Sequence, residues 1–483
     1  MKEFIDQIYN VVWSGALVIL CMVTGIYFTI RFRFPQVRYL KHMVQLLFTG
    51  NSTEKGISSF QAFALAISGR VGTGNIAGVA TAIAMGGPGA IFWMWVIAFL
   101  GSSSAIVEAT LGQMYKEVRT DEFRGGPAYY IQKGLNSKTF AWVFAMVTII
   151  STGFLLPSVQ SNSIALAVNA SFDISHHYIA MILVALLAII IIGGVKRISR
   201  VAEFVVPFMA GAYILMAIVI MLMNFKQIPD ILMLIIDSAF NTHSAFGGII
   251  GMAISWGVKR GIYSNEAGQG TAPHAAAAAA VSHPVKQGLV QGFSVYVDTL
   301  FVCTATAFMI LFTGQYNVSN PEGGFIVQNI SDTIQAGPGY TQAAVAKHFP
   351  MIGDGFVAIA LFFFAFTTIM AYYYIAETNV SFVMGKSKNK ILIWILRLLI
   401  LVSVYIGCLT TAASAWTLGD IGVGIMAWLN VIVIILLHRR VLVLVRDYDQ
   451  QRDAGKDPVY DNRKYNFRHM EFWNKNNAEK QQS

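Results

Sequence analysis

The chain has 483 residues, of which 55% are hydrophobic and only 12% are charged, and its mean hydropathy is +0.58. A soluble domain usually keeps about a quarter of its residues charged, so this composition excludes a soluble globular protein and indicates a membrane protein. The formal charge of +9 lies mainly in segments between long apolar runs, which indicates basic cytoplasmic loops and argues against a nucleic-acid partner.

Long apolar segments follow one another along most of the chain. A helix of roughly 20 apolar residues is long enough to cross the hydrocarbon core of a bilayer. The fold class is therefore an all-α polytopic membrane protein. We predict eleven transmembrane helices, at approximately residues 13–31, 57–86, 88–115, 139–168, 178–195, 201–224, 245–268, 287–314, 354–384, 391–409 and 416–438.

Eleven spans place successive loops on alternating sides of the membrane, and the basic residues are concentrated on one of these sides. The side that holds Lys2, Lys226 and Lys347 contains no other Lys or Arg. Because basic loops stay in the cytoplasm, we predict a multi-pass cell-membrane protein with its N-terminus outside and its C-terminus in the cytoplasm. Of the 34 Lys and Arg residues, 27 lie in the predicted cytoplasmic segments, which are residues 31–57, 116–138, 196–200, 286, 386–390 and the tail from 439.

Two of the predicted spans are interrupted by glycines and polar residues. The second span carries four glycines between Ser68 and Gly78, and the seventh carries glycines from Gly247 to Gly261 around Ser255 and Trp256. Glycine destabilises a helix by about 1 kcal/mol relative to alanine, so we expect both helices to unwind there.

The two interrupted spans occupy matching places in the chain. If the first span is set aside, each begins a set of five, and two sets of five must run in opposite directions through the membrane. Such paired interruptions are typical of a transporter binding site. The sequence divides into an N-terminal extra helix with a cytoplasmic connector, a first inverted repeat, an extracellular connector, a second inverted repeat and a cytoplasmic tail, at residues 1–56, 57–224, 225–244, 245–438 and 439–483.

An unwound helix in a membrane exposes peptide groups that need partners. Amides at a half-helix N-terminus suit a carboxylate, and exposed carbonyls suit a cation such as sodium. A zwitterionic amino acid together with sodium would supply both partners. The alternative is close helix packing, in which glycines let two helices approach without any ligand, and Gly74-x-x-x-Gly78 has the spacing for it.

Four sequence segments resemble the alanine or glycine:cation symporter family. They are GGPGAIFWMWVIAFLG at residues 86–101, together with residues 69–78, 259–268 and 455–460. This resemblance implies a LeuT-type core of two inverted five-helix repeats preceded by one extra helix. It also implies sodium-coupled, or in some members proton-coupled, uptake of alanine or glycine, with glutamine as the substrate of some members. Sodium is then the coupling ion, and no other cofactor is expected.

The predicted substrate site combines both interrupted helices with a polar position in the fourth span. Gln160 resembles a family substrate contact, whereas Asn162 could equally bond between helices. The amides of the first interruption and the Thr73 hydroxyl would hold a carboxylate, and the second interruption would supply carbonyls and an aromatic wall. The remaining predicted substrate residues are Gly72, Thr73, Gly74, Asn75, Ser255, Trp256 and Gly257.

The predicted sodium site comes from the same resemblance. By similarity to the LeuT fold, the hydroxyls of Thr367 and Thr368 join the carbonyls of Ser68 and Val71 around one ion. Hard cations prefer such oxygen ligands. The alternative for each threonine is a hydrogen bond back to its own helix.

Ionisable residues at membrane depth are functional candidates by default. We predict that Arg70 and Glu266 take part in intramembrane charge pairs, and the partner of Arg70 stays open. Structural ion pairs are the alternative for this set, which is Arg70, Glu108, Glu203, Lys259, Arg260, Glu266, Asp298 and Glu377.

Other function classes find little support in the sequence. The alanine run at 275–280 predicts a short cytoplasmic helix before the next span and no site. The nine histidines are scattered, and the three cysteines lie in apolar runs without disulfide or metal spacing, so an embedded enzyme is not expected. A channel stays a remote alternative, and the sequence leaves the oligomeric state open.

Overall fold

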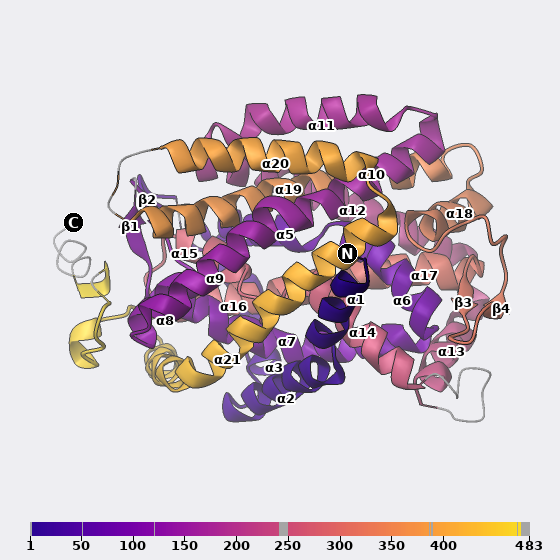
Figure 1. The fold of residues 1–483 in the computed structure, drawn as a ribbon. Coiled ribbons are helices and arrows are strands. Elements are labelled where there is room, and N and C mark those ends of the chain that lie inside the picture. The colour runs from indigo at the N-terminus through magenta and orange to yellow at the C-terminus, as the bar shows by residue number, and fades with distance from the viewer. Residues whose placement is uncertain are drawn as a thin grey trace.

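A computed structural model describes residues 2–50, 52–119, 121–240, 250–385, 387, 390–470 and 472–474. The long helices run side by side in one bundle (Figure 1). The first half of the chain forms α1 (Lys2–Val12), α2 (Gly15–Arg31), α3 (Pro35–Arg38), α4 (Leu40–Leu47), α5 (Ser59–Arg70), the π-helix η1 (Gly74–Gly78), α6 (Val79–Gly86), α7 (Gly89–Met114), β1 (Glu117–Arg119), β2 (Glu122–Arg124), α8 (Pro127–Gly134), α9 (Lys138–Ile150), the π-helix η2 (Ser151–Leu155), α10 (Leu156–Phe172), α11 (His176–Ile191) and α12 (Gly194–Met223).

The second half is again almost entirely helical within the described residues. It forms the 3₁₀-helix η3 (Phe225–Gln227), α13 (Ile228–Phe240), α14 (Ile250–Asn265), α15 (Ala272–Ala278), α16 (Pro284–Tyr296), the π-helix η5 (Val297–Cys303), α17 (Thr304–Thr313), β3 (Asn317–Ser319), β4 (Phe325–Gln328), α18 (Pro338–His348), α19 (Gly353–Met384), α20 (Ile391–Leu409), α21 (Ala412–Asp453) and the 3₁₀-helix η6 (Asn462–Lys464).

The all-α membrane fold class is confirmed. In the described part of the chain, eight helical stretches are long and apolar enough to cross a membrane, and they correspond to eight of the predicted spans. The other three predicted spans, 57–86, 178–195 and 245–268, fall on the two interrupted helices and on α11, which has 16 residues. The total of eleven spans therefore stays a prediction.

The first interruption lies where the sequence predicts it. A capping box starts α5, because the Ser58 hydroxyl accepts from the Gln61 amide and the Gln61 side chain accepts from the Ser58 amide, both at 3.1 Å. The helix ends at Arg70, and Val71 has a ψ of 88°, which no helix allows. The chain resumes as the π-helix η1, a form that often marks functional sites.

The second interruption lies about ten residues beyond its predicted place. Helix α14 runs without a break through Ser255, Trp256 and Gly257, so the prediction that the chain unwinds there is wrong. Gly247 and Gly248 lie outside the described residues. The chain unwinds at residues 266–271, and the alanine run then forms α15, the second half of this broken helix, which is buried.

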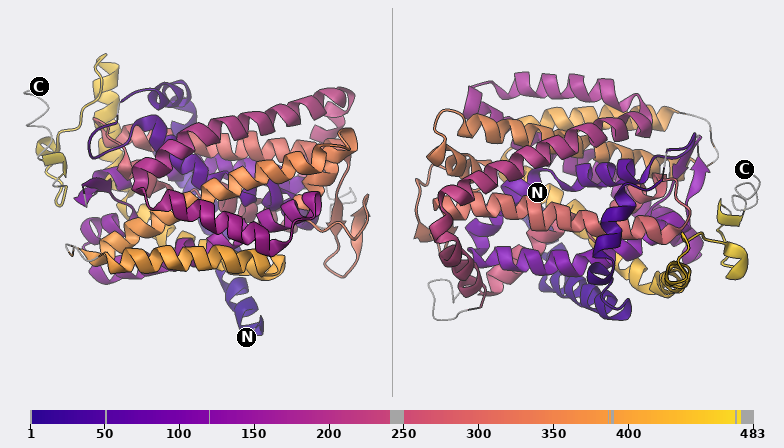
Figure 2. Two further views of the ribbon diagram at one scale, coloured as in Figure 1. Left: turned by 90° about the horizontal axis from the view of Figure 1, so that it is seen from above. Right: turned by 180° about the vertical axis from the view of Figure 1, so that it is seen from behind.

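The two small hairpins mark opposite ends of the bundle. Strands β1 and β2 lie at the same end as the C-terminal tail, while β3 and β4 lie at the other end (Figures 1 and 2). The tail packs against the loop before α16 and against the first turn of α16. The Tyr460 amide donates to the Ser282 carbonyl of the loop at 2.9 Å, and Lys286 Nζ in the helix lies 2.5 Å from Asp457 Oδ1. The segments predicted to be cytoplasmic therefore meet at one end.

The ends of both broken helices are joined near the tail. The Ile57 amide donates to the Ala278 carbonyl at 3.0 Å, and the Ala280 amide donates to the Ile57 carbonyl at 2.9 Å. This short parallel bridge ties the start of α5 to the end of α15. The predicted connector at 225–244 forms η3 and α13 as far as residue 240, and its last residues lie outside the described ones.

Candidate substrate and cation site

The first interruption brings together most of the residues predicted for it. The Gly72 amide donates to Asn75 Oδ1 and the Thr73 amide donates to Gln160 Oε1, both at 2.9 Å. A Cβ at Gly72 would lie 2.5 Å from Thr368 Oγ1 and 2.8 Å from Gln160 Oε1. A side chain at position 72 would therefore displace the Thr368 hydroxyl and the Gln160 side chain, because α10 and α19 both approach the bare backbone there.

The Thr368 hydroxyl spans the end of α5. Its Oγ1 lies 2.7 Å from the Ser68 carbonyl oxygen and 3.4 Å from that of Val71. It also lies 2.9 Å from the Phe364 carbonyl of its own helix α19. Several oxygens thus converge on one buried point, which is the ligand chemistry of a hard cation.

The fourth predicted sodium ligand points elsewhere. The Thr367 hydroxyl donates to the Phe363 and Phe364 carbonyls of α19, both at 3.0 Å. This is the hydrogen bond back to its own helix that is common for threonine in membrane helices. Three of the four predicted ligands therefore meet, and Thr367 lies beside them with its hydroxyl engaged.

The second interruption is held by a carboxylate that the sequence flagged only as a charge. Glu108 on α7 accepts from the Gly268 amide at 3.2 Å and from the Gly270 amide at 3.1 Å. It also accepts from Asn430 on α21 at 2.8 Å, and Asn430 in turn donates to the Gly268 carbonyl at 2.9 Å. Tyr130 donates to Asn430 Oδ1, which completes a network that fixes the unwound chain.

A second buried carboxylate links the two broken helices. Asp298 in η5 accepts from the Asn75 side chain at 2.6 Å and from the Ser264 hydroxyl at the end of α14 at 3.0 Å. The Thr299 hydroxyl donates to it at 2.7 Å. Glu108 and Asp298 thus each contact the broken helix of the other half of the chain.

Ser255, Trp256 and Gly257 are not brought to the first interruption by any contact that the structure describes. A Cβ at Gly257 would lie 2.4 Å from the Ala90 carbonyl, so this glycine serves close packing of α14 on α7. Ser255 is exposed, and the Trp256 ring lies 4.6 Å from Lys259 Nζ. The carbonyls of these residues lie inside a continuous helix and are not free for a ligand.

Tyr263 and Ser264, about two turns further along α14, lie against the first interruption instead. A Cβ at Gly74 would lie 3.1 Å from the Tyr263 ring and 3.2 Å from Ser264 Cα. Sequence reasoning did not select Tyr263 as an aromatic wall, although the motif around residues 259–268 contains it.

An ion pair and an aromatic contact close the space beside Tyr263. Arg260 NH1 lies 2.9 Å from Asp420 Oδ1 on α21, and Lys259 Nζ lies 3.3 Å from Asp420 Oδ2. The Arg260 guanidinium lies 4.4 Å above the Trp416 ring, and Trp416 lies 5.0 Å from the Tyr263 ring. The sequence flagged both cations but neither Asp420 nor Trp416.

Arg70 and Glu266 are close to the interruptions but do not form an ion pair. Arg70 NH1 donates to the Gln291 carbonyl at 3.1 Å and to the Ser294 hydroxyl on α16. Its Nε and NH2 groups are buried without a hydrogen-bond partner. Among the described residues, no carboxylate oxygen lies within 4.0 Å of the Arg70 guanidinium.

The remaining flagged residues make structural contacts. Asn162 donates to the Gly407 and Thr410 carbonyls of α20 at 3.1 and 2.5 Å, which is the bond between helices left open as its alternative. Glu203 accepts from Gln61 at 3.0 Å, and Glu377 lies 3.5 Å from Arg124.

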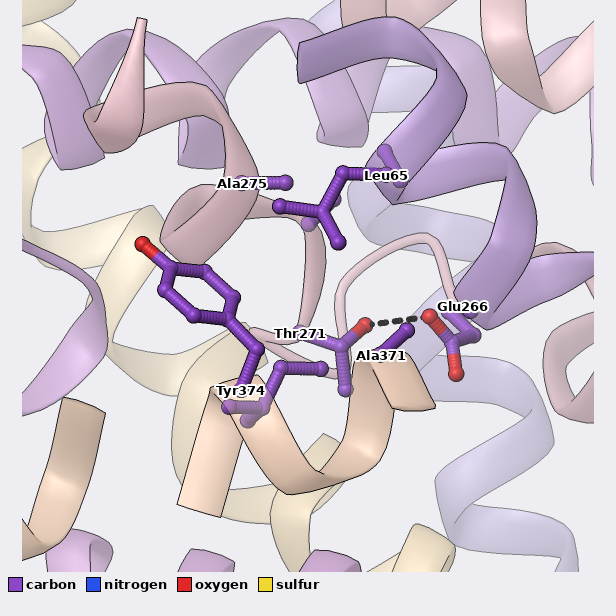
Figure 3. Close-up of a pocket in the computed structure, with 10 residues that line it drawn as sticks. Leu65, Glu266, Thr271, Ala275, Ala371 and Tyr374 are labelled. Atoms are coloured by element: carbon purple, nitrogen blue, oxygen red, sulfur yellow. Dashed lines mark hydrogen bonds between the residues drawn. The ribbon is translucent and has the colours of Figure 1, made fainter. Parts of the chain in front are cut away.

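A narrow cavity lies between α5, the second interruption with α15, and α19 (Figure 3). It has room for about one water molecule. Its lining includes Leu65 and Gly69 from α5, Glu266 and Thr271 from the interruption, and Ala371 from α19. The cavity beside the second interruption is therefore too small for an amino acid in this conformation.

These features define the class of protein. A helical membrane bundle with two helices unwound at matching places, a convergent oxygen site and buried carboxylates that hold the unwound chain is a secondary transporter.

Sequence comparison gives the family. Residues 1–462 match the profile of the sodium:alanine symporter family, and the chain belongs to this family. The carrier protein YrbD of Bacillus subtilis (strain 168) is 56% identical over 475 residues, which are 98% of both chains. The "Sodium/proton-dependent alanine carrier protein" of Bacillus sp. (strain PS3) is 48% identical over 89% of this chain and 97% of its own.

A further relative and a solved structure are also similar to this chain. The "Probable sodium/glutamine symporter GlnT" of Bacillus subtilis (strain 168) is 43% identical over 95% of this chain and 94% of its own. A crystal structure of a manganese transporter from Eremococcus coleocola aligns with a TM-score of 0.50 and 13% identity, over 79% of this chain and 80% of that chain. This last likeness concerns the fold alone. The chain is therefore a membrane carrier that couples amino-acid transport to a cation, and it is not an enzyme.

Proposed function

We propose that this protein is a sodium-coupled symporter that takes up a small neutral amino acid, alanine or glycine, by alternating access. The observation that carries the proposal is the Thr368 hydroxyl, which lies across the Ser68 and Val71 carbonyls at the end of α5. Sodium would replace this hydrogen bond with ion–oxygen contacts, and Thr367 would join only if its hydroxyl turned away from α19.

The amino-acid carboxylate would occupy the amides of the first interruption. The Gly72 and Thr73 amides are now satisfied by neutral side-chain oxygens of Asn75 and Gln160, which a charged carboxylate can displace. The buried Thr73 hydroxyl has no hydrogen-bond partner and offers a further donor. Gly74 and Tyr263 would bound the substrate, so a small side chain is favoured.

Contacts on two sides of the broken helices support alternating access. On one side the Arg260–Asp420 pair and Trp416 cover the site, and on the other the bridge between Ile57 and Ala279 joins the broken helices. We propose that these contacts open in turn. The orientation that we propose, with the N-terminus outside the cell and the C-terminus in the cytoplasm, is supported by the 27 of 34 basic residues on the tail side.

Two alternatives are favoured by the relatives. The 43% identity to a relative named for sodium and glutamine supports glutamine as the main substrate. The name of the carrier that is 48% identical supports proton coupling beside sodium coupling. Counterflow in proteoliposomes separates them, with labelled alanine against labelled glutamine and sodium against choline.

The same assay tests the sodium site. We expect Thr368→Val to raise the half-saturating sodium concentration at least about tenfold, since it removes an oxygen ligand, a loss of about 1.4 kcal/mol or more. Thr148→Val is the matched control, because the Thr148 hydroxyl is buried and donates only within its own helix at 2.9 Å. Sodium dependence in Thr368→Val equal to that of wild type would contradict the proposal.

A further inference from the structure

Among the described residues, the buried acids Glu108, Asp298 and Glu266 lie at the two interruptions, and Glu266 differs from the other two. Glu108 accepts hydrogen bonds from three donors on its two oxygens. Both oxygens of Asp298 accept hydrogen bonds as well, from Asn75, Ser264 and Thr299. Glu266 accepts one hydrogen bond on Oε2, from the Thr271 hydroxyl at 2.8 Å, and its Oε1 has none (Figure 3).

Glu266 also lacks a cation in contact. Its side chain is only 2% exposed, and among the described residues no nitrogen of Lys, Arg or His lies within 4.0 Å of its oxygens. An ionised carboxylate that is buried without a paired charge is strongly disfavoured. Such a group needs either a positive charge that arrives during the transport cycle or a proton.

The position of Glu266 ties it to the proposed sodium site without making it a ligand. It lines the narrow cavity together with Gly69, which is next to Ser68 in α5, and Ala371, which follows Thr368 by nearly one turn of α19. A Cβ at Gly69 would lie 3.4 Å from Glu266 Oε2. A cation at the end of α5 would thus act on Glu266 across protein rather than across water, where screening is weak.

The groups that face Glu266 can be named for each neighbouring element. Arg70 comes from α5, Asp298 from η5, Tyr372 from α19, and Tyr263 from α14, the helix that ends just before Glu266. Arg70 is the basic group of this set, and Asp298 is a second acid. On α7, Glu108 bonds the same unwound segment through the Gly268 and Gly270 amides.

We propose that Glu266 is the proton-binding group that links sodium affinity to pH, holding a proton when the sodium site is empty and releasing it when sodium binds. This inference rests on the proposed function. The O–H bond on the carboxyl breaks as the ion arrives, the proton passes to water, and the net charge around the interruption stays the same. Because linkage is reciprocal, protons must then weaken sodium binding to the extent that sodium expels protons.

Sodium binding to the purified full-length protein tests this link. Sodium-dependent change in tryptophan fluorescence would be titrated at several pH values in wild type, Glu266→Gln and the control Glu203→Gln, whose carboxylate bonds Gln61 away from the interruptions. We expect the half-saturating sodium concentration of wild type and Glu203→Gln to rise up to about tenfold per pH unit on acidification. Glu266→Gln should bind sodium with no such pH dependence.

A second measurement needs no variant. In weakly buffered solution with a pH-indicator dye, sodium added to the wild-type protein should release protons, and choline should not. Pronounced pH dependence in Glu266→Gln, or sodium binding to wild type without proton release, would overturn the role of Glu266. Absence of sodium binding to wild type at every pH would instead overturn the sodium coupling itself, so the two failures are distinguishable.

Discussion

In both interrupted helices, backbone amides of the unwound segment donate to side-chain oxygens, but the side chains differ. At the first interruption, the free amides of Gly72 and Thr73 are satisfied by neutral amide side chains. At the second, the amides of Gly268 and Gly270 are satisfied by the carboxylate of Glu108. At the first interruption each amide has its own side-chain partner, which a ligand can displace separately. At the second, one carboxyl group accepts from both amides and from Asn430, so a ligand would have to displace the whole network.

This difference assigns separate tasks to the two halves. The first interruption has replaceable partners, a convergent oxygen point at Thr368 and an unpartnered Thr73 hydroxyl, which suits a site that binds and releases. The second is fixed by Glu108, Asn430 and Tyr130 from three other helices, which suits a support that keeps its shape.

Removal of the Glu108 carboxyl group should have the largest effect. Glu108→Ala leaves the Gly268 and Gly270 amides buried without an acceptor, at a cost of about 1–3 kcal/mol for each. We expect a marked fall in the melting temperature of the detergent-solubilised protein and a loss of uptake. Glu203→Ala is the matched control, and an unchanged melting temperature in Glu108→Ala would show that the second interruption does not depend on this carboxylate.

Filling the first interruption should affect binding more than stability. In Gly72→Ala the added Cβ would meet Thr368 Oγ1 at 2.5 Å, so the hydroxyl must leave the Ser68 carbonyl. We expect sodium and alanine affinities to fall at least about tenfold, or 1.4 kcal/mol, in equilibrium binding. Gly251→Ala is the matched control, because a Cβ there meets no atom within 4 Å. Equal sodium and alanine affinities in the two variants would show that position 72 is not part of the binding site.

The first interruption could be predicted because its sequence signal is local. Four glycines alternate with Thr73 and Asn75, and each glycine or polar residue weakens the helix where it stands. The second could not be placed in the same way. Gly257 and Gly261 sit four residues apart on one face and serve packing on α7, whereas the chain unwinds where Glu266 takes a φ of 55°.

Contacts between distant segments account for most of what sequence reasoning missed. Glu108 and Asp298 were flagged as charged residues, but their partners could not be predicted. Gly268 lies 160 residues from Glu108 in the sequence, and Asn75 lies 223 residues from Asp298. Trp416 and Asn430 lie in an ordinary apolar span and carry no local signal, whereas Asp420 in the same span is an ionisable residue that could have been flagged. The sequence predicts a separate cytoplasmic helix at the alanine run, whereas in the structure this run forms α15, the buried second half of a broken helix.

The smallest effect should come from a neighbour of the site on the same helix. Asn162 lies two residues from Gln160, but its side chain donates to carbonyls of α20. We expect Asn162→Leu to lower stability by about 1 kcal/mol, as for a typical lost hydrogen bond, and to leave the KM for alanine unchanged. A raised KM with unchanged stability would extend the substrate site along α10.

The most direct test is an experimental structure of the full-length protein determined with sodium and alanine. The account predicts an ion between the Ser68 and Val71 carbonyls and Thr368, and an alanine carboxylate on the Thr73 amide in place of Gln160. The Glu108 contacts to Gly268 and Gly270 should be unchanged. Density for alanine at the Glu266–Thr271 segment alone, with the first interruption still closed by Asn75 and Gln160, would contradict it.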